Sequence, residues 1–458
     1  MKEINGNEFL DLLKSEETLF EDYIINLNTG LVIDINKITL SSNFVNCIFK
    51  GVQIEITDLF IDDKKENLHT LSFKECSFEI DLLLINGCFF HFLIFKDINK
   101  FPKKININSS NINHFEINNY KNKFSLEITD TTFNITSKIR AILFEKLRII
   151  ECTAHKSFTI SKCSFVELEI IFSYFKEYLN FIDNKVRNSE FKFNEFEKTN
   201  FKKTNFGEKA EFYDNKFYGT TLFEGIQNLN NTNFIIRSCN FLKYAYFNDS
   251  KLSHLLIDTT TFNEIASFQN TEFNTIEINR TLFEKSAFFD DMKINNIYLC
   301  SKITIRNIKQ QLLRTDNKID YDLYKAYELN AHKLELKGKS FWWFLNKDAI
   351  ILIISHHFSN NGLNWFKALL LTFIWGFVFY SLFYWGNIND FNVSKIYFDN
   401  TENFLFGYTK YLIPTNIYNP LTPGREYVKS NWISFIIGKI IIAIGIYETI
   451  KSFRKYKK

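Results

Sequence analysis

Large apolar residues recur at a fixed short spacing in the first two thirds of the chain. In the segment EFKFNEFEKTNFKKTNF a phenylalanine stands at every fifth position, at Phe191, Phe196, Phe201 and Phe206. A period of five matches neither the 3.6-residue turn of an α-helix nor the two-residue alternation of a free-standing strand. Four such sides would close a square coil of about twenty residues, which predicts a β-solenoid.

A longer period marks the coils themselves. The tetrads NCIF, ECSF, KCSF and SCNF each place a small residue two positions before a phenylalanine, and similar positions recur 21 or 22 residues apart in two runs. These positions are Cys88, Ser110, Thr131 and Cys152 in the first run and Cys239, Thr260 and Thr281 in the second. We therefore predict a β-helix over residues 26–300, in which each coil buries its apolar side chains against its neighbours.

Both ends of a solenoid need a cap. Within residues 1–25, Phe9, Leu10 and Leu13 lie at helical spacing, which predicts an N-terminal helical cap. After Cys300 the phenylalanine pattern stops and two helical faces follow, separated by the turn sequence TDNK. This change predicts a helical hairpin, or collar, over residues 301–340.

The next segment, 341–363, is apolar and aromatic but too short to cross a bilayer. Lys347 and Asp348 interrupt it, and Trp342 and Trp343 stand near its start. Tryptophan is enriched at membrane–water interfaces, so we predict an interfacial amphipathic segment with these two side chains at headgroup level.

Two longer apolar segments, 364–386 and 432–450, can each cross a hydrocarbon core of about 30 Å. Trp365, Trp385 and Trp432 stand at their ends as interfacial anchors. The tail 451–458 is basic and contains no acid, whereas the connecting segment 387–431 balances four bases against four acids. Segments rich in Lys and Arg that flank a span stay on the cytoplasmic side, so both termini are expected in the cytoplasm. The two spans would then lie in the inner membrane of the cell.

The N-terminal sequence supports the same orientation. Acidic residues interrupt the apolar stretch near the N-terminus, whereas the central region of a secretory signal peptide is uncharged and apolar. The connecting segment is then extracytoplasmic. Its part 401–424 is apolar enough to re-enter the membrane and holds three of the four prolines, but it lacks a TVGYG-type ion filter.

A lysine inside the second span is the sharpest candidate functional residue. Lys439 lies seven residues after Trp432, and a charge at that depth is costly. It either faces a pore or a neighbouring helix, or it extends its stem back to the interface. Gly438 and Gly445 share a helical face and would allow spans of neighbouring subunits to pack closely. We take these three residues as pore or gate candidates.

Composition and local chemistry narrow the function classes. A net charge of +3 gives no global case for nucleic-acid binding, and the run Lys198, Lys202, Lys203 and Lys209 is either a candidate ligand-binding patch or a solvated face. Seven cysteines without a CxxC pair indicate reduced, buried small residues rather than disulfides or a metal site. The chain contains no HExxH, GxSxG or glycine-rich phosphate motif, so we expect neither an enzyme nor a cofactor.

The pentads and tetrads resemble those of the pentapeptide-repeat family, whose members form right-handed quadrilateral β-helices. With the WFLNK stretch, the NWFKALLLT span and the basic tail, the chain looks like bacterial pentapeptide-repeat proteins with a two-span, ion-channel-like C-terminus. It is similar to channel effectors of anti-phage systems of the Hailong type. The fold class expected is mainly β: a quadrilateral β-helix, then a helical hairpin and two transmembrane helices.

The resemblance also implies a function. Such an effector is a homo-oligomer in the lipid bilayer, which we expect to be a tetramer, because two helices per chain cannot enclose a pore. Its β-helix would respond to an oligonucleotide or other small regulatory ligand made by a partner enzyme of the same defence system. Opening would depolarise the membrane in an abortive infection. The alternative is a membrane-anchored scaffold that binds a partner and forms no pore.

Overall fold

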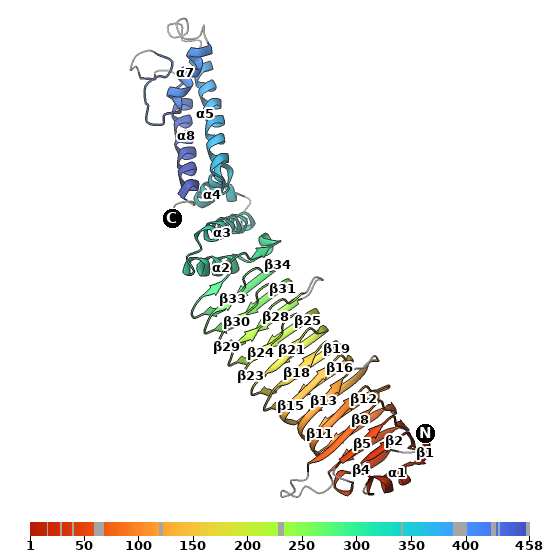
Figure 1. Ribbon diagram of the computed structural model, residues 1–458. Helices are drawn as coiled ribbons and strands as arrows, with labels where there is room; N and C mark the ends of the chain where they lie inside the picture. Colours follow the sequence, from red (N-terminus) through yellow and green to blue (C-terminus); the bar gives the residue numbers. More distant parts are fainter. Residues whose placement is uncertain are drawn as a thin grey trace. The chain divides into compact units, whose positions relative to one another are not determined.

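The fold is known from a computed structural model that describes residues 1–15, 17–27, 30–38, 41–58, 68–118, 122–227, 233–339, 342–387, 401–422, 427–428 and 431–454. The chain divides into two compact units, Met1–Thr304 and Ile305–Lys458. The first is a parallel β-solenoid and the second is helical (Figure 1), with two long apolar helices near the C-terminus. The predicted mainly-β fold class is confirmed.

One wall of the solenoid is a 13-stranded parallel sheet to which each coil contributes one strand. Its strands are β4 (Leu31–Asp34), β7 (Gln53–Thr57), β10 (Leu82–Asn86), β12 (Lys104–Asn108), β14 (Phe124–Thr129), β16 (Leu143–Ile150), β19 (Ser164–Ile171), β22 (Lys185–Lys192), β25 (Asn205–Tyr213), β28 (Asn233–Arg237), β31 (Lys251–Asp258), β34 (Glu272–Asn279) and β37 (Lys293–Ile294).

The remaining strands form the other walls. At the N-terminal end they are β1 (Lys2–Asn5), β2 (Leu19–Glu21), β3 (Tyr23–Asn26), β5 (Ser41–Val45), β6 (Ile48–Lys50), β8 (His69–Lys74), β9 (Ser77–Glu79), β11 (Phe89–Lys96), β13 (Asn111–Asn118) and β15 (Thr132–Arg140). Strand β15 pairs with two shorter strands, β17 and β18. The side of the coil that is one long strand in β15 is therefore divided by a corner in the next coil.

From that point each coil adds two short strands. They are β17 (Thr153–Ala154), β18 (Phe158–Ser161), β20 (Tyr174–Phe175), β21 (Leu179–Ile182), β23 (Glu195–Phe196), β24 (Thr199–Asn200), β26 (Lys216–Phe217), β27 (Thr221–Leu222), β29 (Asn240–Phe241), β30 (Ala245–Tyr246), β32 (Thr261–Phe262), β33 (Ala266–Ser267), β35 (Leu282–Phe283) and β36 (Ala287–Phe288). Short 3₁₀ turns lie at η1 (Ile35–Lys37) and η2 (Ile297–Leu299).

The small residues of the tetrads lie at the bends of the coil. At one bend Lys162 adopts a left-handed conformation with φ 57°, and Cys163 follows it into the core. The Cys163 thiol donates to the Ser161 carbonyl at 3.3 Å. One coil later Asn184 accepts from the Cys163 amide through Oδ1 at 2.9 Å and donates to the Ile160 carbonyl at 2.9 Å. At this bend, a thiol and an amide side chain therefore supply hydrogen-bond partners for backbone N–H and carbonyl groups that point into the core.

The phenylalanines stack along the interior in continuous rows. In one row Phe196, Phe217, Phe241, Phe262 and Phe283 follow one another with ring centroids 5.1, 4.4, 4.7 and 5.1 Å apart. Their planes are nearly parallel, which is a favourable arrangement for aromatic rings when they are offset. The repeat spacing thus places identical side chains in register from coil to coil.

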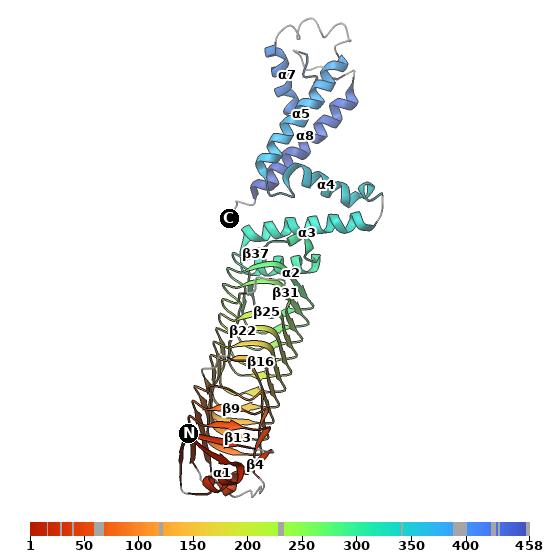
Figure 2. The same cartoon turned by 90° about the vertical axis from the view of Figure 1, so that its right-hand side faces the viewer.

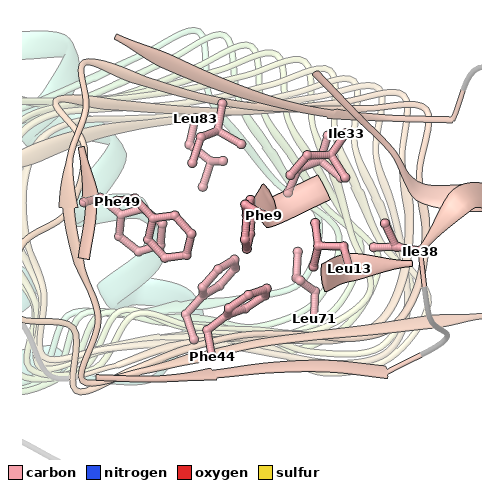
Figure 3. Close-up of a pocket in the computed structure, with 12 residues that line it drawn as sticks. Phe9, Leu13, Ile33, Ile38, Phe44, Phe49, Leu71 and Leu83 are labelled. Carbon is pink, nitrogen blue, oxygen red and sulfur yellow. The ribbon is translucent and has the colours of Figure 1, made fainter. Parts of the chain in front are cut away.

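Helix α1 (Gly6–Leu13) lies at the N-terminal end of the solenoid. Asn5 begins it with a capping box, in which its side chain accepts from the Glu8 amide and the Glu8 carboxylate accepts from the Asn5 amide. Phe9 and Leu13 point from α1 into the interior, toward Phe44 and Leu71 (Figure 3). Within the predicted cap 1–25 the helix covers only these eight residues, and strands occupy most of the remainder.

The helical unit contains α2 (Lys302–Arg314), whose first residues belong to the solenoid unit, α3 (Lys318–Lys339), η3 (Trp343–Leu345), α4 (Lys347–Ser359), α5 (Trp365–Asn387), α7 (Thr401–Leu412) and α8 (Trp432–Phe453). Glu328 on α3 binds Arg306 at 2.9 Å and also Lys309, so α2 and α3 pack as a hairpin. Helices α5 and α8 run antiparallel side by side, with α4 at one end and α7 at the other (Figures 1 and 2).

Candidate functional site in the helical unit

The two long helices, α5 and α8, are long and apolar enough to cross a membrane. Most side chains on their buried faces are small or polar, nine of the thirteen, whereas their exposed faces carry large apolar ones. The buried side chains are Ala368, Thr372, Gly376, Tyr380, Phe383 and Asn387 on α5, and Phe435, Gly438, Lys439, Ile442, Gly445, Glu448 and Ser452 on α8. The core helix of a water-soluble protein shows the opposite distribution, whereas helices that pack in lipid use small residues at their contacts.

Glycines set the spacing of these helices. A Cβ atom at Gly445 would lie 2.1 Å from Thr372 Oγ1, and one at Gly438 would lie 1.9 Å from Tyr411 Oη. Both glycines therefore allow α8 to approach α5 and α7 of the same chain. That close approach brings α5 and α8 into contact along most of their length.

Helix α7 runs beside the C-terminal half of α5 and the N-terminal half of α8, toward the middle of both. Its Phe404 ring lies 5.0 Å from Tyr384, its Tyr408 hydroxyl donates to the Phe373 carbonyl at 2.6 Å, and Leu412 contacts Gly376. Gly376 is 11 residues from either end of α5 (376 − 365 and 387 − 376). At about 1.5 Å per helical residue, the end of α7 therefore lies about 16 Å inward, at the middle of α5.

Lys439 binds the end of α7. Its Nζ donates to the carbonyls of Tyr411 and Ile413, both at 2.7 Å, and lies 4.9 Å and 5.3 Å from the ring centroids of Tyr411 and Phe435. The last carbonyls of a helix have no intrahelical donor and carry its negative dipole end, so an ammonium group is a favourable partner. Of the alternatives for Lys439, a helix contact is the one present in this chain.

A buried carboxylate, which the sequence did not single out, lies at the opposite end of α8. Glu448 is 5% exposed and accepts from Ser359 Oγ at 2.5 Å, Ser355 Oγ at 3.1 Å and Lys451 Nζ at 3.1 Å. We call these four residues the Glu448 cluster. Because both serines lie on α4, the cluster joins α4 to α8. The only signal in the sequence was an acid inside an apolar segment with a lysine three residues later.

The predicted tryptophan anchors lie at or near the helix ends. Trp342, Trp385 and Trp432 are exposed, and Trp343 is half-buried at the start of η3. Trp365 stacks on Phe453 with ring centroids 4.9 Å apart, which brings the first residue of α5 against the last residue of α8. In the predicted loop and tail, residues 388–400, 423–426, 429–430 and 455–458 lie outside the described residues.

The four lysines of the candidate patch on the solenoid lie at different bends and strands. Lys202 binds Glu224 at 2.6 Å, and Lys209 on β25 binds Glu211 at 2.9 Å and Glu190 at 3.2 Å. Lys198 Nζ lies 5.5 Å from the ring centroid of Tyr178, and Lys203 occupies a left-handed bend. With carboxylates bound to Lys202 and Lys209, their charge is largely neutralised, as on a solvated face.

Comparisons of the chain with family models, curated proteins and solved structures found no match. The class of protein therefore comes from the fold itself: a parallel β-solenoid followed by helices, two of which are long and apolar enough to cross a membrane. Membership of the pentapeptide-repeat family and likeness to anti-phage effectors remain predictions from the sequence pattern.

Proposed function

We propose that this chain is a bacterial inner-membrane protein whose helical units assemble into a homo-oligomeric ion channel gated by the cytoplasmic β-solenoid. The observation that supports this most directly is α7, a short helix between the two candidate spans that reaches their middle. A segment of this kind lines the conduction path in simple two-span channels. Because one pair of spans cannot enclose a pore, several copies, a tetramer by our expectation, would surround it.

The free-energy cost of placing backbone carbonyls in a bilayer is consistent with α7 ending at the middle of the spans. Backbone that leaves the helix at membrane depth is tolerated only where it is buried in protein or lines a water-filled cavity. Lys439 satisfies the carbonyls of Tyr411 and Ile413 at that depth. The outward faces of α5 and α8, which carry side chains such as Ile374 and Ile440, would meet lipid.

Gating requires a ligand or partner with different affinity for the closed and open states. By the sequence resemblance, that ligand would be an oligonucleotide or other small molecule supplied by a partner enzyme, and opening would depolarise infected cells. The Glu448 cluster offers a physical connection to α8, since movement of α4 would act on α8 through Ser355 and Ser359.

Ion flux from liposomes tests the proposal. The purified full chain would be reconstituted and assayed with no addition and with short oligodeoxyribonucleotides as the probe, beside protein-free liposomes and a known pore as controls. We expect an oligomer and a probe-dependent flux. A monomeric chain that gives no flux in either condition, while the known pore does, would contradict the channel.

A membrane-anchored scaffold is the second candidate. It is favoured by the fact that Lys439 and Glu448 both find partners within one chain, so the helical unit is a complete anchor by itself. A membrane-potential dye in expressing cells separates the two functions. The scaffold leaves the potential unchanged with and without the partner enzyme that supplies the regulatory ligand, whereas the activated channel collapses it.

A further inference from the structure

Basic side chains lie where α3, the end of α4 and the start of α5 meet. Helix α3 contacts the α4–α5 corner through Asn361, whose Nδ2 donates to the Ala326 carbonyl at 3.5 Å. Lys333 and Lys337 follow Ala326 by 7 and 11 residues (333 − 326 and 337 − 326), which places them on the same face of α3. Figure 2 shows α3 and α4 lying across the end of the α5–α8 pair.

Two further basic side chains, His356 and Lys367, come from α4 and α5. Lys367 Nζ, in the first turn of α5, donates to Asn360 Oδ1 at 2.8 Å and to the His356 carbonyl at 3.4 Å. We call Lys333, Lys337, His356 and Lys367 the basic cluster. Burial and the charge of Lys337 lower the pKa of Lys333. Burial, followed by the charges of Lys333 and Lys367, lowers the pKa of His356.

The three lysines of the basic cluster lack a carboxylate partner within the described part of the chain. Two acids of the helical unit have other partners: Glu335 on α3 lies 3.4 Å from His332, and Glu448, which contacts α4, binds Lys451 at 3.1 Å. Grouping several lysine ammonium groups without a counter-ion is unfavourable, because the like charges repel one another. An anion is therefore the ligand that these side chains favour.

We propose that the basic cluster binds the phosphate of an anionic phospholipid. Lys367 lies two residues after Trp365, where α5 would enter the bilayer. Directly beside it begins an exposed apolar row on α5, formed by Phe366, Leu370 and Phe373, along which acyl chains would lie. Basic clusters at the cytoplasmic ends of spans are suited to such headgroups. The row of apolar side chains favours a lipid over a free phosphate ion.

This inference rests on the membrane insertion of the proposed function but not on ion conduction. Native mass spectrometry of the full chain in detergent, with titrated phosphatidylglycerol, measures the bound lipid directly. We expect K333Q/K337Q to bind phosphatidylglycerol about 25-fold more weakly, at about fivefold per lysine near an anionic headgroup. K333R/K337R, which keeps both charges, and K325Q, which removes an exposed lysine of the same helix, should bind as wild type does.

Two further ligands, added in the same way, identify what the cluster binds. Phosphatidylcholine, whose headgroup has no net charge, and inorganic phosphate should not raise the melting temperature of the wild-type protein, whereas phosphatidylglycerol should. Unchanged phosphatidylglycerol binding by K333Q/K337Q would overturn the inference, as would equal stabilisation by inorganic phosphate. If K333Q/K337Q does not fold, K367Q decides by the same titration. A chain that fails to enter liposomes contradicts the proposed function itself, whereas an inserted chain without lipid preference contradicts only this inference.

Discussion

At the scale of the residue, Lys439 stabilises the helical unit through the two carbonyls that it binds. In K439M both carbonyls lose their charged donor. The Ile413 carbonyl keeps the Asn416 amide as a donor at 3.1 Å, whereas the Tyr411 carbonyl stays buried and loses the donor printed for it. An unpaired buried polar group costs about 1–3 kcal/mol, so we expect a destabilisation of that size in thermal unfolding of the detergent-solubilised protein. K410M, which removes a lysine of α7 that lies over the Phe406 ring, is the matched control. Equal melting temperatures for K439M and K410M would contradict the assignment.

Gly445 gives a second prediction at this scale. In G445A the new methyl group meets Thr372 Oγ1 at 2.1 Å and must push α5 away from α8. Overpacking of this kind costs about 1–3 kcal/mol, measured in the same unfolding assay. Gly338 on α3 has nothing within 4 Å of its Cβ position. G338A should therefore be stabilising, by up to about 1 kcal/mol, because alanine favours a helix.

At the scale of the element, the phenylalanine rows carry the stability of the coils. Phe223 is fully buried and stacks between Phe201 at 4.9 Å and Phe247 at 4.8 Å. F223A should cost about 3–5 kcal/mol of unfolding free energy because it leaves a cavity between two coils. Phe172 is 56% exposed at a bend, so F172A serves as the control and should change stability far less. Similar losses in both variants would show that burial in the row is not the cause.

The Glu448 cluster connects two elements, α4 and α8. E448A leaves Lys451 without its carboxylate in a largely buried site and should cost about 3 kcal/mol. E448Q keeps a partner for Ser355 and Ser359 and should cost less. If the alanine substitutions E448A and K451A couple, the double variant is less destabilised than the sum of the two single ones. Strict additivity in this cycle would exclude the ion pair as a source of stability.

At the scale of the whole molecule, cysteines distributed along the solenoid report on its integrity. All seven are free and buried, and burial raises the pKa of Cys88, Cys152, Cys163 and Cys239 to about 12. The native chain should therefore resist iodoacetamide at pH 8, and all seven thiols should react after denaturation. Rapid alkylation of the native chain would mean that coils open locally.

The four thiols of raised pKa, Cys88, Cys152, Cys163 and Cys239, make stability depend on pH. Their pKa in the folded chain lies above the ordinary value of 9.0, so at high pH the unfolded chain releases protons that the folded chain retains. Stability should be unaffected by these groups below about pH 9 and fall progressively between about pH 9 and pH 12. Denaturant unfolding of the protein across this range measures the effect, with C152A/C239A expected to show a shallower decline.

The sequence by itself determined the features that depend on local periodicity. The 21-residue repeat predicted the solenoid because identical side chains recur at the same bend and must stack on one another. Length and hydropathy likewise predicted α5 and α8, since both properties are read within one segment. The absence of a CxxC pair among seven cysteines predicted that they are reduced and buried, and their burial is confirmed.

Only the tertiary structure decided which polar groups meet. Lys439 binds carbonyls 26 and 28 residues away, and Glu448 binds serines 89 and 93 residues away, on helices whose contacting faces no local pattern specifies. The glycines at 438 and 445 could serve any neighbour until the fold brought Tyr411 and Thr372 against them. Because α5 and α8 are apolar on all sides, hydrophobic periodicity does not mark their buried faces. The partner of a buried charge depends on how separate helices pack, and that information is not local.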